Sequence, residues 1–197
     1  MKLFCFAFFC YLYGAIPYAY LATRIIRKKD LRTEGTGNIG VTNAFKVGGK
    51  SAGLLTIAGE ISKAVIPILT ARFFFNDRLN ITLLFVFLSF LGTSFSIFLK
   101  GKGGKGSTVT LWSLGILSPY GCLVLLFFWS AIVLYSKNNP KLKIIPLFLI
   151  PVIFHIFERN VYFTTFCTLI SITTYINNRI RLDDYKFYNI FNKPPEN

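Results

Sequence analysis

The chain has 197 residues, of which 53% are hydrophobic, including 22 Phe, and its mean hydropathy is +0.54. A soluble domain of this size leaves too much surface exposed to conceal so many apolar side chains, so the composition excludes an ordinary soluble fold. The formal net charge is +14. Such a basic chain would usually suggest nucleic-acid binding, but here the charges lie in short loops between apolar runs, which is typical of membrane proteins.

Apolar runs in chain order predict the membrane segments. Three long runs with few or no charges are Leu3–Thr23, Ala52–Ala71 and Leu79–Leu99. At about 1.5 Å of rise per residue, roughly 20 residues of helix cross the hydrocarbon core. Shorter runs follow at Ser107–Ser118, Tyr120–Tyr135, Ile144–Phe157 and Val161–Ile176. We therefore predict an all-α integral membrane protein, built as a bundle of about seven transmembrane helices.

The distribution of basic residues predicts the orientation of this bundle. With the N-terminus outside, the loops 24–51, 100–106 and 137–143 and the C-terminal tail hold 17 of the 22 Lys and Arg residues, whereas the outer side holds four. Such an excess is typical of the cytoplasmic side of a membrane protein. We therefore expect the N-terminus outside and the C-terminus in the cytoplasm. Residues 1–182 are expected to form one transmembrane domain, followed by a polar cytoplasmic tail at 183–197.

The first predicted cytoplasmic loop contains a glycine-rich segment, Glu34–Lys46. Glycines let the backbone turn tightly and approach a ligand closely, and successive N–H groups in such a loop can bind one anion. The candidate phosphate-binding residues are Thr36, Gly37, Asn38, Gly40, Thr42, Asn43 and Lys46. A flexible loop without a ligand explains this segment equally well when it is considered alone. A dinucleotide-binding motif is excluded, because a membrane segment and not a β-strand precedes the glycines.

A second glycine-rich segment, Lys100–Thr108, connects two predicted membrane helices and ends where a helix begins. Lysines together with the free N–H groups of a helix N-terminus favour a bound phosphate. The candidate ligands are Lys102, Gly103, Gly104, Lys105 and Gly106. A nucleotide-binding P-loop is excluded, because Lys105 is followed by glycine and not directly by a hydroxyl residue. The alternative is a positively charged anchor with turn glycines, but the density of glycine favours the phosphate site.

Two further places carry charges in or next to a membrane segment. Glu60 and Lys63 lie three residues apart and share one face of a predicted helix. They either face a cavity inside the bundle or form a structural ion pair near the interface. The last span ends in Asn177–Leu182, which contains two arginines. These arginines either reach lipid headgroups or bind a phosphate through two parallel hydrogen bonds.

In the order and spacing of their motifs, these segments resemble the bacterial glycerol-3-phosphate acyltransferases that use acyl phosphate as donor. The resemblance rests on Gly14–Pro17, Gly35–Asn43 and Lys102–Gly106 and extends over nearly the whole chain. It implies transfer of an acyl group from acyl phosphate to the 1-hydroxyl of sn-glycerol 3-phosphate. The product would be lysophosphatidic acid, in the first step of phospholipid synthesis.

The resemblance also implies where the protein acts and with what. It predicts a multi-pass protein of the bacterial inner membrane whose active site faces the cytoplasm. The expected partners are acyl phosphate, glycerol 3-phosphate and membrane lipids, with no nucleic acid, and a monomer suffices. Neither a cofactor nor a metal ion is expected.

Residue roles follow from the same resemblance. The expected catalytic residues are Thr36, Lys105, Tyr175 and Asn178. The expected substrate-binding residues are Gly37, Asn38, Gly40, Thr42, Asn43, Lys46, Lys63, Lys102, Gly103, Gly104, Gly106 and Arg181. Several positions depart from the family pattern: Thr36 replaces a serine, Lys46 an arginine and Glu60 an aspartate, and Thr93 and Tyr175 stand where histidines are expected.

Two other functions fit parts of the sequence. The missing histidines favour a non-catalytic relative that keeps its anion-binding loops in order to bind lipid phosphates. A small transporter of phosphorylated solutes would need a polar path, and hydroxyl residues recur at helical spacing in the third span, at Thr82, Ser89, Thr93 and Ser96. Because such hydroxyls commonly connect helices to one another, transport is the least favoured of the three functions.

Overall fold

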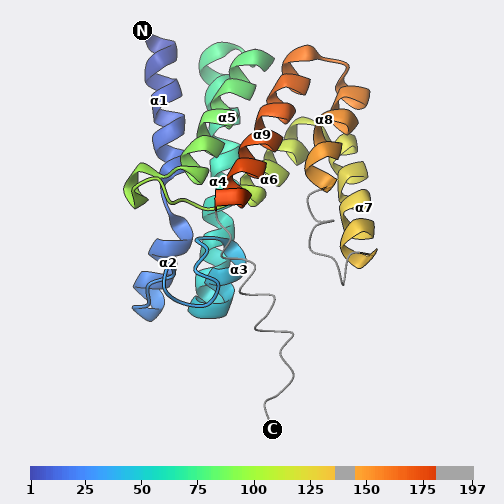
Figure 1. The fold of residues 1–197 in the computed structure, drawn as a ribbon. Coiled ribbons are helices and arrows are strands. Elements are labelled where there is room, and N and C mark those ends of the chain that lie inside the picture. Colours follow the sequence, from blue (N-terminus) through green and yellow to red (C-terminus); the bar gives the residue numbers. More distant parts are fainter. Residues whose placement is uncertain (136–144, 181–197) are drawn as a thin grey trace.

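The computed structural model describes residues 1–135 and 145–180, with side chains as far as Asn177. Within these ranges every regular element is a helix, as the sequence predicts (Figure 1). The elements are α1 (Lys2–Ala15), α2 (Tyr18–Arg27), α3 (Val41–Asn43), the π-helical turn η1 (Ala44–Gly48), α4 (Gly49–Phe75), α5 (Leu79–Ser94), the short 3-10 helix η2 (Ile97–Leu99), α6 (Ser107–Leu117), α7 (Pro119–Tyr135), α8 (Ile145–Glu158) and α9 (Val161–Ile180). The predictions for the 137–143 loop and the tail 183–197 lie outside the described residues.

Helix length limits how many elements can cross a membrane. Among the described residues, two helical runs are long and apolar enough, Val41–Phe75 and Leu79–Leu99. A third crossing results if α1 and α2, which meet at a bend of 40°, are taken as one span. The predicted span Ser107–Ser118 forms only the 11-residue α6, and such a helix covers about 16 Å of a hydrocarbon core of about 30 Å. The prediction of seven separate crossings therefore does not follow from the helix lengths.

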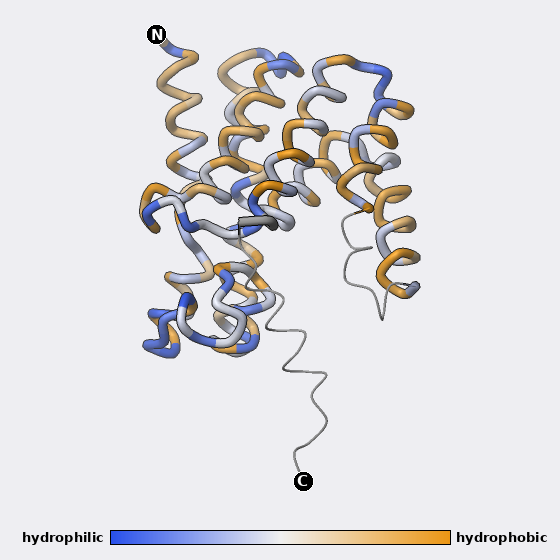
Figure 2. The backbone as a smooth tube through the Cα atoms, viewed as in Figure 1, coloured by the Kyte–Doolittle hydropathy of each residue, from blue (hydrophilic) through white to orange (hydrophobic). Residues whose placement is uncertain are grey.

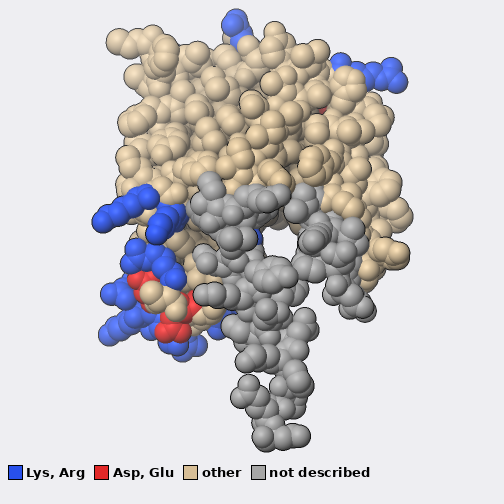
Figure 3. Space-filling view, viewed as in Figure 1, with Lys and Arg blue, Asp and Glu red and all other residues tan. Residues whose placement is uncertain are grey.

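Hydropathy divides the molecule into an apolar body and a polar end. Figure 2 shows mostly orange backbone along α1, α4, α5, α8 and α9, whereas blue and white backbone gathers around α2, α3 and the connection between them. Most of the visible Lys and Arg side chains gather over this same end, together with most of the visible acidic surface (Figure 3). A charged end attached to an apolar body is the distribution expected of a protein whose body is covered by lipid.

The predicted first span, Leu3–Thr23, is broken and not continuous. Its first part, α1, ends at Ala15, and α2 begins at Tyr18. Pro17 has no N–H to donate and disfavours a helical conformation in the residue before it. Ile16 accordingly adopts an extended conformation, with φ −59° and ψ 118°. The sequence signal for the break was this proline, which lies inside an otherwise uniform apolar run.

Side chains at and just after the end of α5 compensate for the break. A helix end leaves backbone carbonyls without partners, and in a lipid environment each unsatisfied group is costly. The hydroxyl of Thr93 donates to the carbonyl of Gly14 at 3.1 Å, and the hydroxyl of Ser96 donates to the carbonyl of Ala15. These are two of the hydroxyls that could have lined a transport path, and here they connect one helix to another.

A close crossing of α1 and α5 holds these groups together. A Cβ atom at Gly14 would overlap the backbone of Ser89, and a Cβ atom at Gly92 would overlap the carbonyl of Tyr11. Small residues let helices approach each other closely in membranes, where packing has to supply much of the association energy. The crossing therefore fixes the position of the chain that follows α5, which contains the second glycine-rich loop.

The main core lies among α5, α6, α7, α8 and α9. Its buried side chains include Phe90, Leu114, Phe154, Phe163 and Ile170. Large apolar side chains also point outward, among them Phe4, Phe73, Phe127 and Phe148. Inward and outward apolar surfaces together are typical of a helix bundle in lipid.

Candidate active site

The first glycine-rich loop is organised by one buried amide. The side chain of Asn43 is 1% exposed, and its Nδ2 donates to the carbonyls of Leu31, Glu34 and Asn38 at 3.0 to 3.1 Å. Its Oδ1 accepts a hydrogen bond of 2.9 Å from the backbone N–H of Thr36. Both ends of the carboxamide are thus used within the loop. Asn43 shapes the loop, and its role as a direct phosphate ligand stays a prediction.

Apolar side chains anchor this loop to the rest of the molecule. Leu31 is fully buried and Ile39 is 9% exposed. Both belong to a small core with Ala19 from α2, Ala44 from η1 and Leu99 from η2. The first loop is therefore packed between α2 and the beginning of the second loop, and its glycine-rich part is held at a defined place.

The second glycine-rich loop lies directly against the ends of α5 and α9. The backbone N–H of Gly103 donates to the carbonyl of Ser94 at 3.3 Å, and that of Gly104 donates to the carbonyl of Thr93 at 2.8 Å. On its other side, Nδ2 of the buried Asn177 donates to the carbonyl of Gly104 at 3.1 Å. Two helix ends that are far apart in sequence thus hold one short loop.

The two loops approach each other most closely at Gly104. A Cβ atom at this position would lie 2.7 Å from the carbonyl oxygen of Ile39 in the first loop. Only glycine allows such an approach of two backbone segments without a shift. Gly104 is therefore the point at which the first loop, the second loop, α5 and α9 meet.

A cavity of about 300 Å³ lies between the two loops, at the lower end of the range for small-molecule sites. The first loop lines it with Thr36, Asn38, Ile39, Gly40, Val41, Thr42 and Asn43. The second loop and the start of α6 contribute Gly104, Lys105, Gly106, Ser107 and Thr108, and α4 contributes Glu60. The unpaired N–H groups of a helix N-terminus favour anions. With a lysine and several hydroxyls beside them, the cavity is suited to a phosphate.

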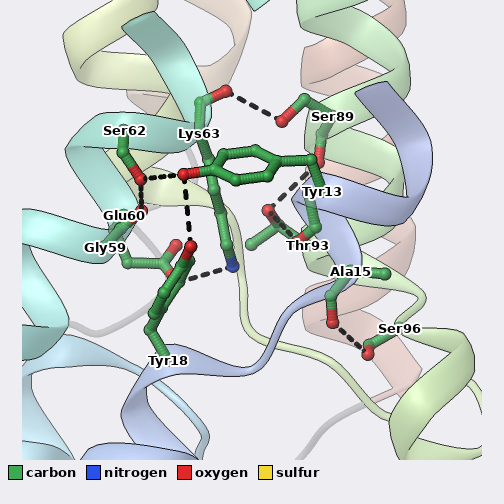
Figure 4. Close-up of polar contacts among 11 residues, drawn as sticks. Tyr13, Ala15, Tyr18, Gly59, Glu60, Ser62, Lys63, Ser89, Thr93 and Ser96 are labelled. Atoms are coloured by element: carbon green, nitrogen blue, oxygen red, sulfur yellow. Dashed lines mark hydrogen bonds and ion pairs between the residues drawn. The ribbon is translucent and has the colours of Figure 1, made fainter. Parts of the chain in front are cut away.

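An ion pair on α4 stands beside this cavity (Figure 4). Nζ of Lys63, whose side chain is 2% exposed, donates to Oε1 of Glu60 at 2.7 Å. The same ammonium group lies 5.3 Å from the centroid of the Tyr18 ring. The hydroxyl of Tyr18 donates to that of Tyr13 at 3.2 Å, and the hydroxyls of Tyr13 and Ser62 share a hydrogen bond of 2.7 Å. Both α1 and α2 are thus connected to α4 around a buried charge pair.

Glu60 lies at the boundary between two spaces. It lines the main cavity, and it also lines a second cavity of about 10 Å³ together with Lys63 and Gly104. A space of this size holds about one water molecule. Glu60, like Ile39 and Gly104, lines both cavities, whereas Lys63 lines only the smaller one.

The structure brings many of the predicted site residues together. Those that line the main cavity are Thr36, Asn38, Gly40, Thr42, Asn43, Gly104, Lys105 and Gly106. Lys63 and Gly103 line the small neighbouring cavity. Gly37, Lys46 and Lys102 line neither of these two cavities.

At the end of α9, Tyr175 and Asn177 lie on different sides of the helix. The ring of Tyr175, predicted to be catalytic, packs against that of Phe148 in α8, with 6.5 Å between the ring centroids. The residue that reaches the second loop is Asn177. Two residues along a helix are rotated by about 200°, so these two side chains point to different sides of α9. The predictions for Asn178 and Arg181 lie outside the described side chains.

Sequence reasoning missed two residues of this site. The motif resemblance favours Asn178, whereas Asn177 is the asparagine whose contact with the second loop is described; the sequence does not show which face of α9 meets that loop. Glu60 was noted only as the partner of Lys63, although it is the member of the pair that lines the main cavity. In both cases the available signal was a polar side chain inside or at the end of an apolar run.

Charged residues at the rim of the first loop neutralise one another. Arg32 hydrogen-bonds the carboxylate of Asp30, with a shortest distance of 2.6 Å, and this contact holds the pKa of Asp30 down at about 2. Nζ of Lys29 lies 3.4 Å from Oε2 of Glu34. Because both acids have a cation beside them, they oppose an incoming anion only weakly. Among the described residues, no three His, Cys, Asp or Glu side chains gather to hold a metal ion.

Fold and site together define an all-helical membrane protein with an anion-type cavity between two glycine-rich loops. Residues 4–184 match the model of the family described as glycerol-3-phosphate acyltransferase. The chain therefore belongs to the glycerol-3-phosphate acyltransferase family, as the resemblance of its motifs predicts.

Individual relatives agree with this assignment. The chain is 36% identical over 165 residues to the glycerol-3-phosphate acyltransferase of Pelagibacter ubique, which covers 83% of this chain and 85% of that relative. It is 33% identical over 162 residues to that of Ruthia magnifica, which covers 82% of each. Its fold is similar to the crystal structure of PlsY (YgiH), an integral membrane glycerol 3-phosphate acyltransferase, in its glycerol 3-phosphate form. That similarity has a TM-score of 0.78 at 23% identity and covers 93% of this chain and 91% of the other.

Proposed function

We propose that the protein transfers an acyl group from acyl phosphate to the 1-hydroxyl of sn-glycerol 3-phosphate. The hydroxyl oxygen attacks the acyl carbonyl carbon, the bond from that carbon to the phosphate oxygen breaks, and the hydroxyl proton ends on the released phosphate. The products are lysophosphatidic acid and inorganic phosphate. The observation that carries the proposal is the cavity of about 300 Å³ that both glycine-rich loops line, in a chain of this family.

The composition of the cavity suits this reaction. An acyl phosphate is already activated, so the protein mainly has to hold two anionic substrates close together and stabilise the oxyanion that develops on the carbonyl. Lysine, hydroxyl groups and backbone N–H groups supply such stabilisation. Covalent attachment of the acyl group to the protein is not required.

The two walls of the cavity take different parts in this proposal. Lys105 and the first turn of α6 bind one of the two phosphate groups, since a cation and a helix N-terminus both favour an anion. Thr36 and Asn38, on the opposite loop, bind the other phosphate or orient the reacting hydroxyl. Asn43 and Asn177 position the two loops through their hydrogen bonds to backbone groups.

We further propose that the bundle lies in the bacterial inner membrane, with the N-terminus outside and the cavity open to the cytoplasm. The basic end of the molecule supports this orientation, because Lys and Arg accumulate on the cytoplasmic side of membrane proteins (Figure 3). The arrangement also suits the substrates. An acyl phosphate is amphiphilic and can arrive from the membrane, whereas glycerol 3-phosphate is soluble and arrives from the cytoplasm.

The test is an assay of the purified protein in detergent, with a long-chain acyl phosphate and glycerol 3-phosphate. We expect lysophosphatidic acid, detected by mass spectrometry, and none when acyl-coenzyme A or acyl carrier protein replaces the acyl phosphate. Lys105→Ala should lower the rate at least about tenfold. Lys50→Ala is the matched control, because it removes an exposed lysine from the first turn of α4 that does not line the cavity.

A wild-type protein that forms no more product than Lys105→Ala would overturn this proposal. The remaining candidate would then be a non-catalytic protein that binds lipid phosphates. One observation favours that candidate. Thr93 stands at a position where the family resemblance predicts histidine, and its hydroxyl lies 3.1 Å from the carbonyls of both Gly14 and Ser89. Its hydroxyl thus serves the packing of helices, where a histidine could have acted on a substrate.

A further inference from the structure

The main cavity contains one acidic side chain, Glu60, among groups that suit an anion. Its other polar lining groups include the cation of Lys105, hydroxyls and the N–H groups at the start of α6, all of which can donate hydrogen bonds. Glu60 is the only carboxylate among the described residues that line the cavity. An acid in an anion-binding cavity weakens the binding of anions, so it calls for a physical explanation.

The surroundings of Glu60 hold its carboxylate in place. Nζ of the buried Lys63 lies 2.7 Å from Oε1 of Glu60 and forms an ion pair with it. The Tyr18 ring packs over the ammonium group and against Gly59, the neighbour of Glu60 in the sequence. The hydrogen bonds of Tyr18 and Tyr13 then fix both helices to α4 (Figure 4). The carboxylate is thus a rigid part of the cavity wall.

An ionised carboxylate can only accept hydrogen bonds, and it has about four lone-pair positions for them. Lys63 occupies one position on one oxygen. A phosphate dianion also only accepts, and it carries the same sign of charge, so Glu60 repels it. A hydroxyl group donates a hydrogen bond and carries no charge. The ligand group that fits beside Glu60 is therefore a hydroxyl.

We propose that Glu60 accepts a hydrogen bond from a hydroxyl group of glycerol 3-phosphate and thereby selects and orients this substrate. The inference rests on the proposed function for the identity of the ligand. The carboxylate directs the hydroxyl end toward α4, while Lys105 and the start of α6 attract the phosphate end. Glu60 is thus a specificity-determining residue, Lys63 and Tyr18 are positioning residues, and one cavity recognises both ends of a small polyol phosphate.

This arrangement predicts discrimination between phosphates that differ only in hydroxyl groups. A site built to bond a substrate hydroxyl rejects the analogue that lacks it, because the polar group of the site is then left without its partner. Propyl phosphate has the carbon chain and phosphate of glycerol 3-phosphate but neither hydroxyl. We expect the wild-type protein to bind glycerol 3-phosphate at least about tenfold more tightly than propyl phosphate, a difference of about 1.4 kcal/mol.

The decisive variant replaces both members of the ion pair, Glu60→Met together with Lys63→Met. The double change removes the acceptor without leaving a buried charge unpaired, and exchanging a buried ion pair for apolar residues of similar volume is often neutral for stability. Lys105→Ala is the matched control at the phosphate end. Glu60→Asp is the conservative variant, since it keeps an acceptor. The dissociation constants of both phosphates are measured for each protein by isothermal titration calorimetry in detergent.

The role of Glu60 is tested by the ratio of the dissociation constants for propyl phosphate and glycerol 3-phosphate, because this ratio is independent of the fraction of active protein. We expect the double variant to lower the preference for glycerol 3-phosphate below about threefold while its affinity for propyl phosphate does not fall. Lys105→Ala should weaken both ligands in parallel, and Glu60→Asp should keep most of the preference. A double variant that still prefers glycerol 3-phosphate as the wild type does, or a wild type without preference, would overturn the inference. Because binding is measured without an acyl donor, failure of acyl transfer would count against the proposed function alone.

Discussion

The hydrogen bonds of Asn43 lead to a quantitative prediction for the first loop. Asn43→Ala removes the donor from the carbonyls of Leu31, Glu34 and Asn38 and the acceptor from the N–H of Thr36. The bond to Leu31 is buried, and losing the partner of a buried group costs about 1–3 kcal/mol. The other three bonds are partly buried and contribute about 0.5–1.5 kcal/mol each, less where water replaces them. We expect the ordered loop to be destabilised by roughly 2–5 kcal/mol.

The destabilisation caused by Asn43→Ala should be confined to the first loop, because this loop makes few of the apolar contacts that stabilise the bundle. We expect Asn43→Ala to lower kcat/KM for acyl transfer by at least about 30-fold, which corresponds to the lower end of that range. Limited proteolysis within residues 31–43 should accelerate in parallel. Asn43→Asp should be as harmful as Asn43→Ala, since it directs a carboxylate at three carbonyls.

Thr33→Ala is the matched control for this experiment. It removes one hydroxyl from the same loop, exposed and bonded only at 3.2 Å to the carbonyl of Asp30, and it should change kcat/KM less than about twofold. The reasoning is refuted if Asn43→Ala keeps both the kcat/KM and the protease resistance of the wild type. The loop would then owe its shape to its apolar anchors, Leu31 and Ile39.

Four further outcomes are expected. In a background without the four native cysteines, Lys29→Cys and Lys100→Cys should react with an impermeant thiol reagent only from the cytoplasmic side, and Arg72→Cys only from outside; the reverse pattern would disprove the orientation. Gly14→Ala should destabilise the protein by about 1–3 kcal/mol because its Cβ would overlap the backbone of Ser89. Gly115→Ala, whose Cβ meets only Cys122 Sγ at 3.7 Å, should be neutral or stabilising, and equal thermal unfolding midpoints of these two variants would contradict the close crossing. Asn177→Leu should lower kcat/KM about tenfold or more, whereas Tyr175→His should raise it by less than about threefold, since that ring faces α8; a tenfold gain would restore the predicted catalytic role of position 175. Finally, Asp30→Asn should leave the pH dependence of the unfolding midpoint unchanged above about pH 5 and should make it shallower below about pH 4, because a lowered carboxyl pKa of about 2 gives stability that is complete above the unfolded pKa and is lost as the pH falls toward 2; identical pH profiles of variant and wild type in the acid range would show that the Arg32 contact is not formed.

Much of the site could be predicted from the sequence because its elements are local. The glycine-rich loops are recognisable from composition, and their place between apolar runs shows that they lie at a membrane boundary. The apolar runs also predict the helices, since α4, α5, α8 and α9 contain or closely match the expected segments. Both the glycine-rich loops and the helices are determined by residues that are consecutive in the sequence.

The remaining features depend on contacts between distant residues. Whether Asn177 or Asn178 meets the second loop is decided by the rotation of α9, which depends on its packing against α8 and α5. The use of Asn43 inside the loop depends on where three carbonyls gather around its side chain. The bounds of α6 match the predicted segment to within one residue, but a run of apolar residues does not reveal whether so short a helix crosses the membrane by itself. The sites of Asn43 and Asn177 thus depend on which distant partner each side chain finds.

The break between α1 and α2 also constrains the order in which the protein assembles. The hydroxyls that satisfy the carbonyls of Gly14 and Ala15 belong to Thr93 and Ser96, residues that are synthesised about 80 positions later. Until α5 arrives, bare carbonyls at this depth would face hydrocarbon, which costs several kcal/mol for each group. Before α5 is inserted, the segment of α1 and α2 must therefore either form one longer continuous helix or lie at the membrane surface. Docking of α5 and breaking of the first span are then a single event, so the break between α1 and α2 forms only after the hairpin of α4 and α5 has been inserted.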